Sequence, residues 1–431
     1  MAAHATAARA SGVDRAHHLR SDCRACGESA PAQFLDLGPT PLANAFPQSE
    51  SEFADERSYP LGVYLCERCG LVQLLDVIDP EVLFRNYIYV SGTSETLAEH
   101  HRRYADSVVD DLRLKPGDLV VEVASNDGSL LKHFQKRGVR TLGIEPAVNI
   151  AELAAHDGIE TLAVFFNADS ARRIRELYGR AQVVVANNVL AHVDNVRDFL
   201  SGATHLIARS GRVIIEAPYL DSMIERVEYD TIYHEHLSYF SITALLRLFE
   251  SVGLSIVRVE QVAIHGGSIR VYGAHADCHK HAEAVLALAQ QERSRGLTRL
   301  ERFERFAEDV RESRAALVDL LSRLRDEGRS IAGYGAPAKG NTLLNYCRIG
   351  RDLLDFTVDR NPLKIGRFTP GAHLPVLPTG ELCERRPDYT LILAWNFADE
   401  IIRQQSAYAR GGGRFILPTP PARILSAAGD L

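Results

Sequence analysis

The hydrophobic positions of the chain fall into continuous apolar runs that alternate with helical patterns. From about residue 95 to 275, such runs occupy residues 119–124, 141–146, 181–190 and 211–218, each bounded by turn-forming residues. Continuous apolar runs are typical of strands that are covered on both faces in a mostly parallel sheet. This pattern predicts an α/β fold with a doubly wound sheet in the middle of the chain.

The same alternation returns in a shorter form after Gly328. Apolar runs at residues 330–336, 353–359, 389–396 and 412–418 predict a second, smaller α/β unit. Residues from about 281 to 327 are instead rich in Ala, Leu, Glu and Arg and contain no proline. That composition favours one or two long amphipathic helices, with Gly296 as the interruption.

These changes divide the chain into five parts. The first 22 residues are rich in Ala, Arg and His and lack an apolar stretch, so we expect a disordered tail. The expected parts are a tail (1–22), a small cysteine-paired domain (23–80), the main α/β domain (81–280), a helical connector (281–328) and the second α/β domain (329–431).

Charge and cysteine content narrow the class of protein. The 431 residues carry a formal net charge of −7, which gives no electrostatic reason to expect a nucleic acid as partner. No apolar run reaches 18 residues and no export signal is visible, so we expect neither a membrane span nor secretion. Paired cysteines without an export signal indicate metal binding with reduced thiols in the cytoplasm.

Cys23 and Cys26, with Cys66 and Cys69, form two C-x₂-C pairs. Four thiolates suit tetrahedral Zn²⁺ and leave no position for a catalytic water, so the predicted zinc is structural. The alternatives are a redox pair, which neither motif supports by its context, and a zinc ribbon that binds nucleic acid. The acidic balance and the lack of a basic cluster around the cysteines argue against the ribbon.

The turn that follows the run at 119–124 is the predicted ligand site of the sheet, because α/β proteins bind ligands at the carboxyl ends of their strands. Gly128 would allow close backbone approach, and Glu145 could take both hydroxyls of a ribose. The turn lacks the G-x-G-x-x-G motif, which disfavours a pyrophosphate as its ligand. It is compatible with a ligand that carries the amine and carboxylate of a methionyl group. The same residues fit an ordinary turn that binds no ligand about equally well. The predicted ligand-binding residues are Glu122, Ser125, Asn126, Asp127, Gly128, Glu145, Pro146, Asn187 and Asn188.

Tyr233-His234-Glu235-His236 is the densest group of titratable side chains. A histidine can abstract a proton from a carbon beside a ketone, a carboxylate can fix its tautomer, and a tyrosine can donate to the enolate oxygen. A second metal site and surface histidines remain alternatives. His192 follows the fourth predicted strand at the edge where the ligand should lie, although a histidine there is more often structural.

The segment 333–341 lies between an apolar strand and a probable helix. Its backbone amides, with Lys339 and Asn341, could hold a diphosphate, although a vestigial turn with packing glycines fits nearly as well.

Taken together, these motifs resemble the sugar C-methyltransferases of antibiotic deoxysugar pathways, which methylate C-3′ of nucleotide-linked 4-keto sugars. The resemblance covers nearly the whole chain after residue 22. It includes both cysteine pairs, FLDLGPTPLANAF (34–46), YIYVSGTS (87–94), SNDG (125–128), GIEPA (143–147), DTIYHEHLSYFS (230–241), HGGSIR (265–270), GYGAPAKG (333–340) and LAWNF (393–397).

The resemblance implies a zinc-binding amino-terminal domain, a central class I methyltransferase domain that binds S-adenosylmethionine, and a Rossmann-like carboxyl-terminal domain that helps to hold the sugar nucleotide. It further implies that His236 is the general base with Glu235 as its partner. Tyr233, His192 and Tyr87 fall on other active-site positions, with Tyr89 as the alternative to Tyr87. The implied substrate-binding residues are Tyr89, His265, Arg270, Lys339 and Asn341. Ala124 departs from the family, which commonly has glycine there.

The predicted function is therefore methylation of C-3′ of a 4-keto-deoxysugar, with dTDP as the expected nucleotide. Alternatives are a methyltransferase of the same architecture that acts at C-5′ or on another small acceptor, and a zinc-ribbon protein with an inactive core. The nucleotide base, an amino or hydroxyl group at C-3′, and the oligomeric state stay open, with a monomer as one option.

Overall fold

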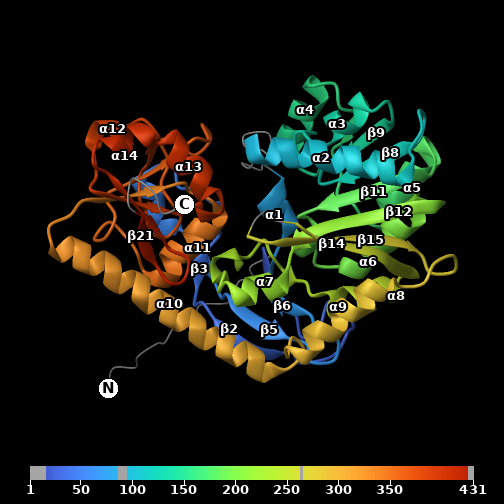
Figure 1. Cartoon of the computed structure of the whole chain (residues 1–431), viewed down its shortest axis with the longest axis horizontal. Helices are drawn as coiled ribbons and strands as arrows, with labels where there is room; N and C mark the ends of the chain where they lie inside the picture. The colour runs from blue at the N-terminus through green and yellow to red at the C-terminus, as the bar shows by residue number, and fades with distance from the viewer. Residues whose placement is uncertain (1–15, 86–94, 263–265, 426–431) are drawn as a thin grey trace, which may run out of the picture.

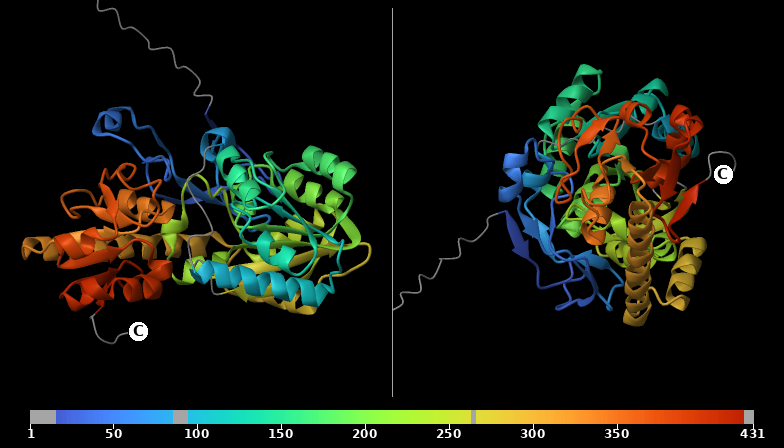
Figure 2. Two further views of the ribbon diagram at one scale, coloured as in Figure 1. Left: turned by 90° about the horizontal axis from the view of Figure 1, so that it is seen from above. Right: turned by 90° about the vertical axis from the view of Figure 1, so that its left-hand side faces the viewer.

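The computed structural model of the chain describes residues 16–85, 95–262 and 266–425. Two α/β units lie side by side, with the amino-terminal region from residue 16 onward and the long helix α10 between and below them (Figure 1). Two further views show that the amino-terminal region, in blue, lies against both units (Figure 2). No helix in the described ranges has the length and apolarity to cross a membrane.

The central unit contains a seven-stranded sheet in the order β10-β9-β8-β11-β12-β15-β14, in which β15 is antiparallel to its neighbours and the other pairs are parallel. The four predicted strands are confirmed as β8, β9, β11 and β12. The strands are β8 (Leu119–Val123), β9 (Arg140–Ile144), β10 (Thr161–Leu162), β11 (Ala181–Asn187), β12 (Ile207–Pro218), β14 (Leu254–Val262) and β15 (Ser268–His275).

Helices cover both faces of this sheet, which explains the continuous apolar runs. Val121 of β8 packs with Phe199 in the core on one face, and Val120 packs with Phe134 in the core on the other. Figure 1 shows α2 and α3 on one face and α6 and α8 on the other. The helices are α2 (Glu95–Leu112), α3 (Leu131–Lys136), α4 (Val148–His156), α5 (Ala168–Tyr178), η3 (Leu190–His192), α6 (Val196–Leu206), α7 (Leu220–Glu225), η4 (Tyr229–Thr231) and α8 (Ile242–Glu250).

The carboxyl-terminal unit has a six-stranded sheet in the order β18-β17-β16-β19-β20-β21, parallel except for the edge strand β21. Its strands are β16 (Ile331–Tyr334), β17 (Thr357–Asp359), β18 (Val376–Pro378), β19 (Tyr389–Ile392), β20 (Arg414–Leu417) and β21 (Arg423–Leu425). Its helices are α11 (Ala338–Cys347), α12 (Glu381–Arg385), η5 (Trp395–Phe397), α13 (Ala398–Gln404) and α14 (Ser406–Arg410). The predicted second α/β unit is therefore confirmed.

The helical connector consists of α9 (Glu283–Ser294) and α10 (Leu300–Asp326), and Gly296 interrupts it with a positive φ of 83°. Phe306 of α10 shares one buried core with Val63 of the amino-terminal region, Ile232 of the central unit and Leu344 of the carboxyl-terminal unit. One apolar core thus joins three parts of the chain, which fixes how their polar side chains meet.

The amino-terminal region adds a four-stranded sheet in the order β13-β6-β5-β2. Its edge strand β13 (Ser238–Tyr239) comes from the central unit, directly after the titratable cluster. The region contains β1 (His17–Leu19), β2 (Ala32–Asp36), β3 (Thr40–Pro41), η1 (Glu50–Asp55), β4 (Ser58–Tyr59), β5 (Gly62–Leu65), β6 (Val72–Leu74), β7 (Asp76–Ile78) and α1 (Pro80–Phe84). The expected disordered tail is too long, because β1 pairs with β7 and His17 bonds to Asp76 at 2.8 Å.

Candidate active site

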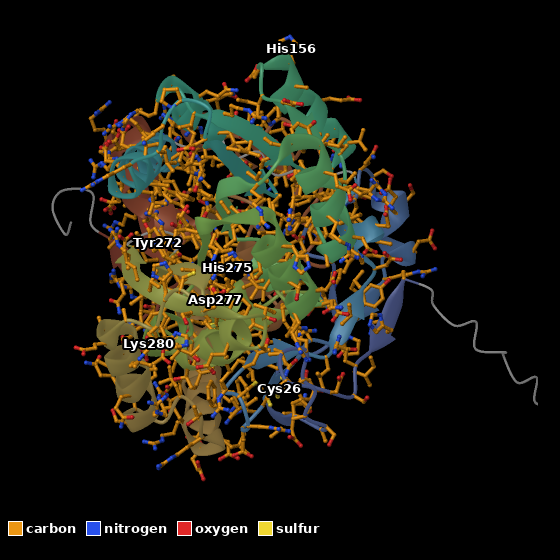
Figure 3. The ribbon with its side chains drawn as sticks, turned by 90° about the vertical axis from the view of Figure 1, so that its right-hand side faces the viewer. Cys26, His156, Tyr272, His275, Asp277 and Lys280 are labelled. Carbon is orange, nitrogen blue, oxygen red and sulfur yellow. The ribbon has the colours of Figure 1, made fainter. Side chains whose placement is uncertain are left out.

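The four cysteines of the two C-x₂-C pairs converge in the amino-terminal region. Their sulfur atoms all lie within 4.8 Å of one another, and the Cys23–Cys69 and Cys26–Cys66 distances are both 3.6 Å. Tetrahedral zinc with bonds of about 2.3 Å would place its sulfur ligands about 3.8 Å apart. Cys26 is partly exposed and lies near the surface (Figure 3), whereas the other three are buried. The cluster fits structural zinc.

One cavity of about 670 Å³ reaches from the central sheet to the carboxyl-terminal unit. Its floor is the carboxyl edge of β8, β9 and β11, as the strand order predicts for a ligand site. The predicted residues that line it are Glu122, Ser125, Asn126, Glu145, Pro146, Asn187, Asn188, His192, Tyr233, His236 and Lys339.

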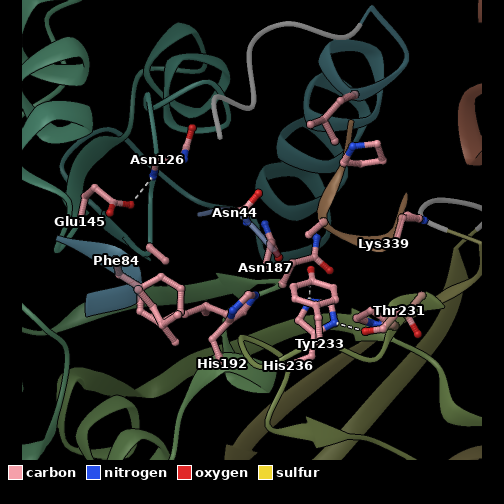
Figure 4. A pocket seen from close by; sticks show the side chains of 18 of the residues that line it. Asn44, Phe84, Asn126, Glu145, Asn187, His192, Thr231, Tyr233, His236 and Lys339 are labelled. Carbon is pink, nitrogen blue, oxygen red and sulfur yellow. Dashed lines mark hydrogen bonds between the residues drawn. The ribbon is translucent and has the colours of Figure 1, made fainter. Parts of the chain in front are cut away.

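Glu145 holds the turn after β8 in place. Its carboxylate accepts hydrogen bonds from the backbone N–H of Asn126 and of Ala147, both at 2.9 Å (Figure 4). Within the described residues, Glu122 Oε2, Asn187 Oδ1 and Asn188 Oδ1 are buried without a hydrogen-bond partner. Unsatisfied acceptors at the cavity wall call for a ligand rich in donors. The ammonium, ribose hydroxyls and adenine amino group of S-adenosylmethionine would supply them.

The turn itself carries backbone strain. Ala124 and Asn126 have positive φ angles of 55° and 50°, a region in which alanine is disfavoured. The family's glycine at position 124 is thus explained by backbone conformation. Gly128 is also left-handed, and a Cβ there would meet Ile159 at 2.7 Å. Glycine at this position therefore serves the turn and its packing against Ile159, and close approach of a ligand stays a prediction.

The titratable cluster forms a turn, with the His236 N–H bonded to the Tyr233 carbonyl at 2.8 Å. The turn brings the Tyr233 hydroxyl within 2.8 Å of His236 Nε2 and sends His234 away to bond the Pro60 carbonyl at 3.0 Å. His236 Nδ1 lies 2.8 Å from the carbonyl oxygen of Thr231. Figure 4 shows His236, Tyr233 and His192 grouped at one end of the cavity.

These bonds determine the tautomer of His236. A carbonyl oxygen can only accept, so Nδ1 carries the proton and Nε2 of the neutral ring is the basic nitrogen. Tyr233 then donates to Nε2. The tautomer is fixed by a backbone carbonyl, a role that we had expected for Glu235.

Glu235 instead accepts a hydrogen bond of 2.6 Å from Asn44 Nδ2. Asn44 belongs to the amino-terminal region and lines the cavity. Its amide therefore joins that region to the residue beside the predicted base.

His192 packs edge-on against His236, with ring centroids 4.8 Å apart, and against Phe84 at 5.5 Å. Burial lowers its pKa to about 4, so the ring is neutral at neutral pH. A neutral imidazole beside His236 does not repel a proton arriving on that base.

The carboxyl-terminal unit contributes two ammonium groups to the cavity wall. Lys339 lies over the Trp395 ring at 4.4 Å, and its buried Nζ has no hydrogen-bond partner in the described part of the chain. Lys364 donates to the Ala336 carbonyl at 2.7 Å. Burial lowers the pKa of both lysines, and nearby carboxylates oppose that shift. Two cations on one wall suit an anionic group of a ligand.

Two predicted substrate residues have other partners. Arg270 is 4% exposed and donates to Glu216 at 2.6 Å, so its charge is neutralised inside the central sheet. Asn341 is fully buried and donates to the Ala43 carbonyl at 2.7 Å. Neither residue lines the cavity, so substrate contact by either stays a prediction. Asp127 caps its own turn through Ser129 N–H at 3.2 Å. Tyr87, Tyr89 and His265 lie outside the described residues.

Residues of the cavity that were not predicted from the sequence include Asn44, Phe84, Thr231 and Lys364. Asn44 lies in the segment 34–46, one of the motifs on which the family resemblance rests. That motif pointed to this part of the chain, although not to Asn44 itself. Thr231 acts through its backbone, which no side-chain pattern reveals. Lys364 lies shortly after β17, near the carboxyl end of a predicted parallel strand. That position could have marked it as a candidate for ligand binding.

Family models match three consecutive parts of the chain. A zinc-binding domain matches residues 23–84, a methyltransferase domain matches residues 97–259, and a C-methyltransferase C-terminal domain matches residues 263–420. The chain is also similar to the C-methyltransferase NovU of Streptomyces niveus, with 38% identity over 411 residues, 95% of this chain and 98% of that protein.

Two solved structures that the chain resembles cover less than half of it. One is the magnesium protoporphyrin IX methyltransferase of Synechocystis PCC 6803 (17% identity, TM-score 0.33, 44% of this chain and 88% of that chain). Another is an S-adenosylmethionine-dependent methyltransferase of Clostridium acetobutylicum (10% identity, TM-score 0.35, 41% and 92%). With three family models in order and a relative matched over nearly its full length, the chain belongs to the family of zinc-binding C-methyltransferases that includes NovU.

Proposed function

We propose that this C-methyltransferase uses S-adenosylmethionine to methylate C-3′ of a 4-keto-deoxysugar linked to a nucleotide, with dTDP as the expected nucleotide and the cytoplasm as the expected location. One observation carries the proposal. The basic Nε2 of His236 lies in the same cavity as the turn built by Glu145 and Asn126. A base and a methyl donor can therefore act on one carbon atom. The choice of sugar and nucleotide rests on the family resemblance of the motifs.

The reaction begins with removal of a proton. A ketone at C-4′ acidifies the C-3′ hydrogen, and His236 Nε2 takes this proton while the C–H electron pair moves toward the carbonyl oxygen. The Nδ1 hydrogen bond to the Thr231 carbonyl stabilises the imidazolium that results. The hydroxyl of Tyr233, which donates to Nε2 in the free enzyme, is positioned to donate to the enolate oxygen instead.

S-adenosylmethionine, when bound, supplies the electrophilic methyl group that C-3′ accepts as the ketone reforms. The residues that would hold it are the carboxylates and amides at the carboxyl edge of the sheet. The enzyme's further contribution is orientation, because the carbon and the methyl group must be aligned. Lys339 and Lys364, on the opposite wall, would bind the diphosphate of the nucleotide.

A deuterium exchange assay tests this proposal. The enzyme is incubated in D₂O with a panel of dTDP-4-keto sugars, and exchange at C-3′ and C-5′ is followed by NMR. We expect exchange at C-3′ and methylation at the same carbon when S-adenosylmethionine is added. We expect His236→Asn to lower both rates by roughly 10²–10⁴-fold.

The control is the affinity for S-adenosylhomocysteine, which calorimetry should find unchanged in His236→Asn, because the cofactor turn is not altered. Exchange only at C-5′ would contradict the proposed position, and full activity of His236→Asn would contradict the proposed base.

A further inference from the structure

Helix α11 of the carboxyl-terminal unit points two polar side chains out of its own unit. Asn341 and Thr342 lie on its first two turns and are 0% and 1% exposed. Buried polar groups need hydrogen-bond partners, and the Nδ2 of Asn341 and the Oγ1 of Thr342 find theirs in other parts of the chain, whereas Asn341 Oδ1 has no partner among the described residues. These contacts have no part in the proposed chemistry.

Asn341 reaches the amino-terminal region. Its Nδ2 donates to the carbonyl of Ala43 at 2.7 Å, and the next residue, Asn44, donates to Glu235 at 2.6 Å. Only one peptide unit separates the two hydrogen bonds. Because that unit is planar and rigid, the position of the Ala43 carbonyl constrains where the Asn44 side chain begins.

Thr342 reaches the turn that carries the base. Its Oγ1 donates to the carbonyl of Ile232 at 3.1 Å, whereas its other neighbour, the Ala338 carbonyl, is 3.4 Å away. A hydroxyl has one proton, so the shorter contact to Ile232 takes it. The preceding carbonyl, that of Thr231, is the one that holds His236 Nδ1.

We propose that Asn341 and Thr342 are positioning residues for catalysis: through Ala43 and Ile232 they set the placement of Asn44–Glu235 and of His236. The carboxyl-terminal unit then builds part of the catalytic centre in addition to binding substrate. Lys339 lies on the first turn of the same helix, so the substrate-binding wall and the base turn are joined by one rigid element. This inference rests on the proposed role of His236.

The first test compares Thr342→Val with Thr342→Ser. Valine keeps the shape and removes the hydroxyl, whereas serine keeps the hydroxyl. We expect Thr342→Val to lower both the kcat for methylation and the C-3′ exchange rate about tenfold, because displacement of a catalytic group lowers the rate of the chemical step. The KM of the keto sugar should stay within about twofold of the wild-type value. Thr342→Ser should restore most of the rate.

The second test compares Asn341→Ala with Asn345→Ala. Asn345 lies on the same helix, and its amide bonds to the carbonyls of Asn341 and Pro370, both in the carboxyl-terminal unit. Both variants lose one buried amide, so both should lower the melting temperature. Only Asn341→Ala should also lower kcat of the folded enzyme, and equal kcat losses would overturn the inference.

A measurement without substrate separates this inference from the proposed function. In ¹⁵N-histidine NMR of the full chain, we expect the His236 ring signals and their pH titration to change in Thr342→Val and to return in Thr342→Ser. Among the described residues, the rings that face His236 are Tyr233, His192 and Tyr239, and none is altered. An unchanged His236 signal in Thr342→Val would overturn the positioning role. A changed signal with no exchange of any keto sugar by the wild-type enzyme would support it and reject the proposed reaction.

Discussion

At the scale of single residues, two carboxylates, those of Glu122 and Glu145, line the predicted cofactor wall of the cavity. Glu122 is buried, and this burial, with the charges of Asp127 and Glu145, raises its pKa well above the ordinary value of 4.5. Crowded carboxylates favour a positively charged ligand. The ammonium group of S-adenosylmethionine or S-adenosylhomocysteine would stabilise the ionised form of Glu122.

From this we predict that the affinity for S-adenosylhomocysteine rises as the pH is raised through the range in which Glu122 of the free enzyme ionises, and levels off above that range. The affinity rises with pH because the ligand binds the deprotonated carboxylate of Glu122, so protons are released on binding. Glu122→Gln should bind about tenfold more weakly at high pH and lose most of this dependence. Calorimetry in buffers of different ionisation heats measures both the affinity at each pH and the number of protons released on binding.

Glu152→Gln, on the exposed face of α4, is the matched control and should behave as the wild type. A wild-type affinity that is constant over this pH range would contradict the role of Glu122.

At the scale of elements, α2 is fastened to the central sheet by a buried ion cluster. Glu216 of β12 accepts from Arg270 of β15 at 2.6 Å and lies 3.0 Å from His100 of α2. Burial alone would raise the pKa of Glu216, but His100 and Arg270 outweigh it and lower the pKa to about 2. Arg270 also lies over the ring of Tyr104, another residue of α2. Leu97 and His101 of the same helix line the cavity.

Removing one member of this cluster should destabilise the enzyme. We predict that Arg270→Met lowers the free energy of unfolding by about 3–5 kcal/mol, because it leaves the buried Glu216 carboxylate without its arginine partner. The double variant Glu216→Leu/Arg270→Met should recover most of that loss. Urea unfolding measures the stability, and the KM of the double variant tests whether Arg270 touches substrate.

Arg258→Met provides the control, because this arginine is 44% exposed and pairs with Asp111 at the surface. Its effect should stay within about 0.5 kcal/mol. A large rise in the substrate KM of the stable double variant would show that Arg270 contacts the substrate.

At the scale of the whole molecule, the zinc cluster packs beside the turn that carries His236. Cys23, Cys66 and Cys69 belong to the same buried core as Phe240 and Ile242 of the central unit. Arg24, beside the first zinc ligand, donates from its buried guanidinium to the carbonyl of Leu237, the residue after His236. The metal therefore stabilises a region on which the base turn rests.

We predict that removing zinc with a strong chelator abolishes methylation and C-3′ exchange while binding of S-adenosylhomocysteine is largely kept. The reason is that the cofactor turn is built within the central sheet, whereas Asn44 and the base turn depend on the zinc region. On one sample, metal analysis measures the zinc content, NMR measures C-3′ exchange, and calorimetry measures binding of S-adenosylhomocysteine. Re-addition of Zn²⁺ should restore exchange and Mg²⁺ should not; full exchange by the metal-free chain would refute this dependence.

The sequence by itself determined the features that depend on neighbours along the chain. Apolar runs buried on two faces predicted the strands of both sheets, and the C-x₂-C spacing predicted the zinc ligands. The turn after β8 and the carboxylate of Glu145 after β9 followed from strand order, because parallel strands end at one edge.

Only the tertiary structure decided the features that join distant residues. Asn44 meets Glu235 across 191 positions, and Asn341 meets Ala43 across 298. No local pattern encodes such pairs, because they form only when one apolar core draws three parts of the chain together. The tautomer of His236 and the ion pair of Arg270 depended in the same way on a backbone carbonyl and a buried carboxylate that folding brings within hydrogen-bond distance.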